Sequence, residues 1–271
     1  MAFDYQWNFE DGLTPNFSRE NDGTIPVNVD GEQAHGGTRA LKCQVTTADF
    51  LSCMQFRFGN AASPWLTSGI PKNPGMLAGG FWVDWWMWIS SADVIHMKAN
   101  EVDPRQWKLS LARQDIDLGQ STGHWFMHCF GEEVGSSPTL DIIRNVCDTG
   151  AISESTYLFS AGSNGNTAFA VPEATWWRTT MHYQRDSNIA RGRAKCWLNS
   201  SLVTDTGWVT GFGSDDANDE QSVRIGIATA EGHTQTITCY IDDVRITDTP
   251  IFPDIGGGRR RFVGPGGKHR R

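Results

Sequence analysis

Apolar and polar positions alternate along much of the chain, most clearly over residues 80–90, which read GFWVDWWMWIS. A strand sends alternate residues to opposite faces, so this segment predicts a strand with one apolar and one aromatic face. The apolar face holds Phe81, Val83, Trp85, Met87 and Ile89. The other face holds Trp82, Asp84, Trp86 and Trp88. Because a strand that is apolar on both faces is covered on both, we expect it in the middle of a two-sheet sandwich. One face would lie in the core, and the other would line a groove or an interface.

Further strand-like segments are separated by turn signals. They are residues 40–45, 50–58, 107–113, 124–130, 176–184, 193–203, 222–228 and 235–247. Residues 94–100 fit either a strand or a helical turn, and residues 131–156 show no clear pattern. No helix longer than a turn or two and no internal repeat is predicted. The pattern predicts an all-β fold, a two-sheet antiparallel β-sandwich of the jelly-roll kind.

Composition agrees with this fold class. The 271 residues include 29 Gly and 12 Trp, and 20% of them are charged, which is typical of a globular protein with many turns and large aromatic side chains. We expect a sandwich domain over residues 1–253 and a Gly/Arg-rich extension over residues 254–271.

The start of the chain lacks the basic and apolar stretches of a signal peptide. No apolar run approaches the about 20 residues that span a membrane. We therefore expect a soluble protein that is made in a cytoplasm and has no membrane partner.

The six cysteines contain no CxxC pair, which gives a zinc site little support. Most lie in strand-like runs such as LKCQV and AKCWL. We expect them to be free, buried thiols that act as small apolar residues.

Charge divides the chain into an acidic body and a basic tail. From Gly256 onward there are six basic residues and no acidic ones, and Phe262 is the single aromatic residue among them. The residues before Gly256 contain the remaining 17 Lys and Arg and all 31 Asp and Glu, so this body carries a charge of −14 and the tail one of +6. We expect the tail to bind an acidic partner or neighbouring protein subunits, and sequence-specific binding of nucleic acid is not expected. The basic residues are Arg259, Arg260, Arg261, Lys268, Arg270 and Arg271.

Four late segments carry a resemblance to a known family. They read WWRTTMHYQ, RAKCWLNSSLV, SVRIGIA and CYIDDVRIT, and FEDG and GGTRALKCQV near the start match more loosely. These residues resemble the concanavalin A-like lectin/glucanase superfamily, a jelly roll of two large antiparallel sheets. The resemblance covers residues 3–249 in outline and the last third closely. It implies a fold and contact with glycans, and it does not imply an enzyme.

The resemblance also implies a structural calcium ion between the N-terminal acidic turn and the last strand. Asp11, Asp242 and Asp243 stand at the matching positions. Carboxylates and turn carbonyls could supply the six to eight oxygen ligands that calcium takes. The alternative is that Asp242 and Asp243 only end a strand and face solvent.

Two kinds of enzyme occur in this superfamily. Its hydrolases carry two glutamates around an aspartate on one strand, and no Glu-x-Asp-x-Glu occurs here. Its lyases use a Tyr or His base beside Arg and Gln or Asn, and residues 178–184 offer such a set although the family's late Tyr-Lys-Asn pattern is absent. Tyr183 falls on the opposite strand phase from the other three. The lyase candidates are Arg178, His182, Tyr183 and Gln184.

The aromatic face of residues 80–90 offers a glycan-binding surface. The rings of Trp82, Trp86 and Trp88 could stack against the C–H faces of sugars. The alternative is that residues 59–80 or a partner chain cover them.

The sequence therefore favours a virion structural or accessory protein, such as a bacteriophage capsid decoration or tail-associated component. It would be made in the host cytoplasm, anchored in the particle through its basic tail, and able to bind a surface glycan. A polysaccharide lyase or glycoside hydrolase and a plain carbohydrate-binding module are the alternatives, and we lean away from an enzyme.

Overall fold

The computed structural model describes most of the sandwich and parts of its connections. The described residues are 4–12, 27–47, 52–58, 80–99, 107–115, 124–130, 143–148, 172–186, 191–205, 209–210, 220–230 and 234–251. Residues 252–271, which include all of the predicted extension, lie outside this set.

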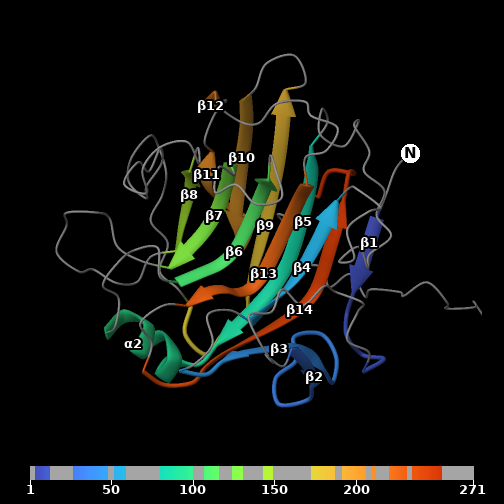
Figure 1. Ribbon diagram of the computed structural model, residues 1–271. Helices are drawn as coiled ribbons and strands as arrows, with labels where there is room; N and C mark the ends of the chain where they lie inside the picture. The colour runs from blue at the N-terminus through green and yellow to red at the C-terminus, as the bar shows by residue number, and fades with distance from the viewer. Residues whose placement is uncertain are drawn as a thin grey trace, which may run out of the picture.

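The larger of the two sheets has nine antiparallel strands (Figure 1). Its order is β11-β10-β9-β5-β14-β3-β2, with β1 paired to β14 and β12 paired to β10. β5 lies in the middle of this order, which confirms the prediction of a central strand. The strands are β1 (Asp4–Trp7), β2 (Val27–Asp30), β3 (Ala40–Val45), β5 (Phe81–Ile89), β9 (Trp177–Asp186), β10 (Arg191–Leu198), β11 (Ser201–Asp205), β12 (Val209–Thr210) and β14 (Ile237–Thr247).

The smaller sheet has five antiparallel strands in the order β4-β13-β6-β7-β8 and lies in front of the larger one in Figure 1. The chain is therefore an all-β, two-sheet antiparallel sandwich, as the alternation predicts. The strands are β4 (Ser52–Phe58), β6 (Trp107–Asp115), β7 (His124–Phe130), β8 (Ile143–Asp148) and β13 (Glu220–Ala230).

The core lies between the two sheets. The apolar phase of β5, which includes Val83 and Trp85, is buried in one cluster with Val223 and Ile225 of β13. Trp82 is also buried but does not belong to this cluster, because it points to the other side of the sheet. The predicted division of β5 into two faces is therefore confirmed.

The connection after β5 is helical, which the sequence did not resolve. Ser90 caps the N-terminus of helix α2 (Ser91–Ala99): its Oγ accepts a hydrogen bond from the backbone N of Asp93 (3.0 Å). Val94 and Met97 are buried on the sandwich. The prediction of no helix longer than a turn or two was wrong here, since two apolar contacts hold a helix of nine residues.

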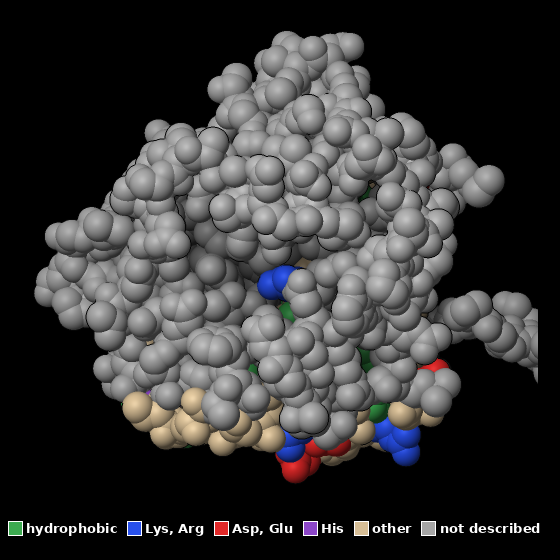
Figure 2. Space-filling view, viewed as in Figure 1, with side chains coloured by type: hydrophobic (Ala, Val, Ile, Leu, Met, Phe, Trp, Pro, Cys, Tyr) green, Lys and Arg blue, Asp and Glu red, His purple; other side chains and the backbone are tan. Residues whose placement is uncertain are grey.

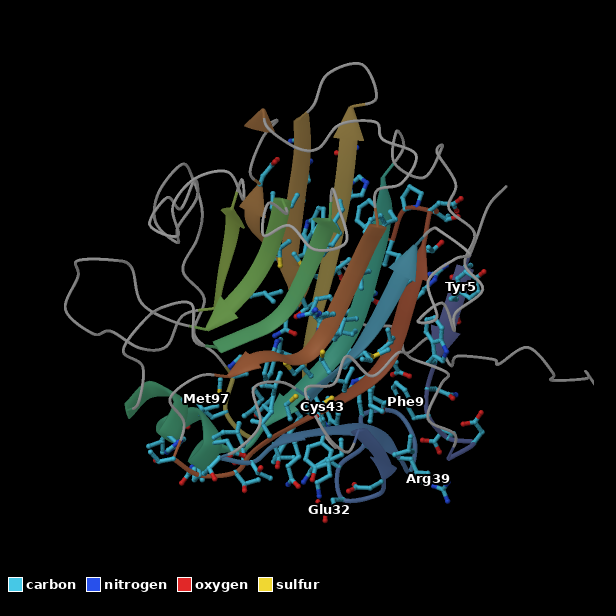
Figure 3. The ribbon with its side chains drawn as sticks, in the orientation of Figure 1. Tyr5, Phe9, Glu32, Arg39, Cys43 and Met97 are labelled. Carbon is cyan, nitrogen blue, oxygen red and sulfur yellow. The ribbon has the colours of Figure 1, made fainter. Side chains whose placement is uncertain are left out.

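Four cysteines of the described part of the chain are buried and form no disulfide: Cys43, Cys53, Cys196 and Cys239. Cys43 lies inside the sandwich (Figure 3) and is paired in register with Cys239 of β14. The hydrogen bond with Cys239, and then burial, raise the pKa of the Cys43 thiol, while burial raises the pKa of Cys53 to about 12. For these four residues the prediction of buried thiols is confirmed. Within the described residues, no helix is long and apolar enough to cross a membrane.

Candidate functional site

The side chains of interest lie on the face of the nine-stranded sheet that points away from the five-stranded sheet, which we call the outer face. Antiparallel register decides which residues meet there. Trp82 lies opposite His182 of β9, and Trp86 lies opposite Arg178. On the other side of β5, Trp88 lies opposite Tyr240 of β14. The predicted tryptophans and three of the four lyase candidates therefore belong to one surface.

Two tryptophans of β5 each carry a stacked histidine ring. The centroids of Trp82 and His182 are 4.1 Å apart with an interplanar angle of 6°. Those of Trp86 and His35 are 3.7 Å apart at 17°. Because the outward positions on either side of Asp84 hold the two stacks, the central strand presents histidine rings above its tryptophans.

The other aromatic residues extend this surface on both sides. Trp197 of β10 stacks on Trp82 at 5.4 Å, and Trp88 meets Tyr240 edge to face at 5.7 Å. Trp82 is only 6% exposed. Trp86, Trp88 and Trp197 are half-buried. The buried ring of Trp82 therefore packs beneath His182 and Trp197, and the partly exposed aromatic rings lie around it.

Asp84 is a buried charge in the middle of the outer face, only 3% exposed. Nε of Arg178 donates to its Oδ1 (2.9 Å) and Oδ2 (3.0 Å), and Nη2 donates to Oδ2 (2.8 Å). The hydroxyl of Thr180 donates to Oδ1 (2.6 Å). A buried carboxylate needs such partners, so Asp84 fixes the guanidinium of Arg178 against the sheet.

A second acidic group lies where β14 meets the loop that contains His35. Oδ2 of Asp242 accepts hydrogen bonds from the backbone N of His35 (2.9 Å) and of Gly36 (3.4 Å). Nδ1 of His35 lies 3.0 Å from Oδ2 of Asp243. The carboxylates of two successive residues thus hold both the backbone and the side chain of His35.

The backbone of β14 is irregular at this point. Its register against β5 shifts between Asp242 and Arg245, and Asp243 has a φ of 48°. A positive φ is uncommon in residues other than glycine, although Asp adopts it more readily than most. The irregularity aims two neighbouring carboxylates at one loop, which a regular strand would not do.

The surroundings change the acidity of Asp242. Burial raises the pKa of Asp242 to about 6, and the adjacent Asp243 carboxylate acts in the same direction. The backbone N–H donors of His35, Asp243 and Gly36 act in the opposite direction.

The three predicted calcium ligands, Asp11, Asp242 and Asp243, do not form one cluster in the structure. Asp11 is exposed, whereas Asp242 and Asp243 are buried and hydrogen-bonded to the His35 loop. Among the described residues, no group of three or more His, Cys, Asp or Glu side chains could hold a metal ion. The prediction that Asp242 and Asp243 face solvent also finds no support, and calcium stays a prediction.

The lyase candidates lie on two sides of the sheet. Arg178 is tied to Asp84, His182 is stacked on Trp82, and Gln184 is half-buried on the same strand phase. Tyr183 is buried in the inter-sheet core, where its hydroxyl donates to Sδ of Met181 (2.9 Å). Burial raises the pKa of Tyr183 well above its usual value. The four side chains therefore do not line one site.

A polar edge borders the outer face at β2 and β3. Nζ of Lys42 donates to Oε2 of Glu32 (2.7 Å) and lies 5.8 Å from the centre of the Tyr240 ring. Basic and acidic side chains lie next to one another at the lower edge of Figure 2, and Figure 3 labels Glu32 and Arg39 there. Ion pairs thus surround the aromatic residues at this end.

Sequence reasoning missed His35, Trp176 and the role of Asp84. Trp176 meets the His35 ring edge to face at 5.7 Å. A charged residue inside an aromatic strand signals a buried ion pair, which could have singled out Asp84. His35 comes from a loop that is 207 residues away from Asp242 along the chain, and no local pattern marks it. The predicted tail residues Arg259, Arg260, Arg261, Phe262, Lys268, Arg270 and Arg271 lie outside the described part.

Comparisons with known proteins give a fold and no family. No family model matches the chain, and no curated protein matches it. Among solved structures, "Cellulose induced protein, Cip1" is similar with a TM-score of 0.55 at 17% identity, covering 91% of this chain and 98% of that one. Alginate lyase Aly36B has a TM-score of 0.48 at 10% identity, covering 90% and 96%.

A GH131 β-glucanase catalytic domain from Podospora anserina has a TM-score of 0.45 at 10% identity, covering 93% of this chain and 92% of that one. At such identities the likeness concerns the fold alone. Of these three, only Cip1 exceeds a TM-score of 0.5 and carries the comparison. The comparison therefore shows a fold similar to that of Cip1, in agreement with the predicted β-sandwich.

Proposed function

We propose that this protein is a carbohydrate-binding β-sandwich whose ligand lies on the outer face of the nine-stranded sheet. The observation that carries this proposal is the pair of histidine rings stacked on Trp82 and Trp86 in the central strand. Sugar-binding surfaces combine flat rings, which cover C–H faces, with a few fixed polar groups that bind hydroxyls. This face has both.

Buried carboxylates prepare the polar groups for binding. Asp84 holds Arg178, and Asp243 holds His35. Side chains that are fixed before a ligand arrives lose less conformational entropy on binding. The arrangement is therefore suited to recognition without a large rearrangement.

A panel of immobilised polysaccharides tests the proposal, followed by titration calorimetry with an oligosaccharide that binds. An aromatic stacking contact contributes about 0.5–1.5 kcal/mol in addition to the apolar area that it buries, so Trp176→Ala and Trp197→Ala should each weaken binding about tenfold. Ile95→Ala is the control, because Ile95 is 58% exposed on α2, a helix whose Val94 and Met97 pack into the inter-sheet core. Unchanged affinity in both tryptophan variants would refute the proposed surface.

A polysaccharide lyase is the second candidate function, because His182 and Arg178 share the outer face. Two observations favour binding over this chemistry. Arg178 already faces the carboxylate of Asp84, which offsets the charge that would neutralise a uronate. Tyr183 is in the core. Release of unsaturated sugar ends by the wild-type protein, with loss in His182→Ala, would favour the lyase.

We also propose that the basic extension anchors the protein in a larger assembly, for which a bacteriophage particle is our leading candidate. The support is the charge division of the sequence, −14 in the body and +6 from Gly256 onward. Deleting residues 256–271 should leave a folded protein that no longer joins the particle. Normal incorporation of this truncated protein would contradict the anchor.

A further inference from the structure

We infer that His35 is the hydrogen-bonding residue of a subsite for neutral sugars, with Asp243 orienting its ring and Trp86 supporting it. This inference rests on the proposed function and deepens it. It names a residue that no local sequence pattern marks, and it narrows the ligand to uncharged, hydroxyl-rich saccharides.

The loop that carries His35 is fixed at its backbone. Oδ2 of Asp242 accepts from the backbone N of His35 and of Gly36, while Oδ1 accepts from the backbone N of Asp243 (2.8 Å). A Cβ on Gly36 would lie 3.1 Å from Oδ2 of Asp243, so the loop approaches β14 closely. The position of His35 is therefore determined by the strand and not by the loop alone.

The ring of His35 is fixed on three sides. Its face lies on Trp86, its edge meets Trp176, and Nδ1 lies 3.0 Å from Oδ2 of Asp243. When the carboxylate of Asp243 is ionised it only accepts hydrogen bonds, so Nδ1 must carry a proton to donate to it. In the neutral form of the ring with this tautomer, Nε2 is an acceptor. Among the described residues no hydrogen bond reaches Nε2, and the side chain is 27% exposed. Nε2 is the position at which a sugar hydroxyl can donate.

The charges around His35 select an uncharged ligand. Asp243 lies beside the ring at Nδ1, and Asp242 lies at the backbone N of the same residue; like charges at short range repel each other. The nearest cation across the strand register, Arg178 opposite Trp86, is already paired with Asp84. A uronate or sulfated sugar would therefore meet two carboxylates near a cation that is already paired, whereas a neutral pyranose carries no charge for them to repel.

His35→Asn is the variant that isolates Nε2. The Asn amide can still donate to Asp243 in place of Nδ1, but it has no group that matches Nε2. Loss of one neutral hydrogen bond is expected to weaken binding of a neutral oligosaccharide about fivefold to tenfold. Ile95→Ala again serves as the control, and the wild-type protein should bind neutral glucans, xylans or galactans more tightly than alginate or sulfated glycans.

Two-bond ¹H–¹⁵N spectra of the histidine rings give a second readout that does not depend on the variant folding. In the free wild-type protein, His35 is expected as the Nδ1–H tautomer, and an added neutral oligosaccharide should shift the Nε2 resonance. An Nε2–H tautomer, or no shift on binding, would overturn the inference. Full affinity of a folded His35→Asn variant would also overturn the inference. The proposed function would then still stand, because the wild-type protein binds the glycan. A wild-type protein that binds no glycan refutes the proposed function itself.

Discussion

At the scale of single residues, the outer face depends on buried charges that are individually compensated. Asp84 lies among aromatic side chains and is 3% exposed, yet its two oxygens receive four hydrogen bonds from Arg178 and Thr180. Removing one partner of such a pair leaves the other uncompensated, which costs more than the pair itself contributes.

Asp84→Asn should therefore lower the free energy of unfolding by about 3 kcal/mol, measured by urea denaturation. The matched control is Asp205→Asn, which breaks the hydrogen bond from Nε of Arg193 (2.8 Å) at a side chain that is 29% exposed. Solvent screens that pair, so its loss should cost less than about 1 kcal/mol. Equal effects of the two substitutions would contradict the role of Asp84.

Tyr183 offers a test by pH. Burial raises the pKa of Tyr183, so above pH 10 the unfolded chain loses a proton that the folded protein keeps. The folded state then binds more protons, and stability falls as pH rises above this value. Tyr183→Phe should make this alkaline loss of stability less steep in denaturation curves between pH 9 and about 11.

The same variant should leave glycan binding unchanged, because the ring faces the inter-sheet core. If Tyr183→Phe abolished glycan binding or glycan cleavage while remaining folded, the side chain would have to act at the outer face, against the geometry described above.

At the scale of elements, β5 is the central strand of the larger sheet, and the entry of the chain into this strand depends on Gly80. This glycine has a φ of 78°, and a Cβ there would overlap the carbonyl oxygen of Tyr183 on β9. Residues with side chains are strained at such a φ. Gly80 thus lets β5 enter the sheet directly beside β9, where the outward residues of both strands meet.

Gly80→Ala should destabilise the protein by about 2 kcal/mol or more, from both backbone strain and displacement of β9. Gly31→Ala is the control, since its Cβ would meet only the carbonyl oxygen of Thr38 at 3.1 Å. Thermal unfolding of the two variants measures the difference. A Gly80→Ala protein as stable as Gly31→Ala would show that β5 can enter the sheet in another way.

Individual elements show which parts of the fold could be predicted from the sequence. The alternation of residues 80–90 predicted β5, its two faces and its central place, because period-two burial is a local signal. The predicted strand at residues 176–184 is β9, whereas the segment predicted as one strand at 193–203 turns back at Asn199 and Ser200 and forms β10 and β11. β8 lies in a segment without a predicted strand, and the stacking of His35 on Trp86 was not foreseen. Both depend on contacts between distant segments, which local patterns do not contain.

At the scale of the whole molecule, two sheets bury a common core and leave the larger sheet with a second, aromatic face. The net charge of the whole chain, −8, also disfavours the binding of polyanionic ligands. Surface chemistry and charge thus both support the proposal of a neutral glycan as the ligand. The proposed anchoring role of the basic tail is independent of this proposal, and each can be refuted without the other.

The most direct measurement is an NMR titration of the ¹⁵N-labelled protein with a neutral oligosaccharide, observing tryptophan indole and histidine ring signals together with the backbone. We predict saturable shifts at His35, Trp176, His182 and Trp197 on the outer face, with the backbone of β13 in the five-stranded sheet unchanged. Shifts confined to the five-stranded sheet, or no saturable shift with any neutral oligosaccharide, would contradict the account.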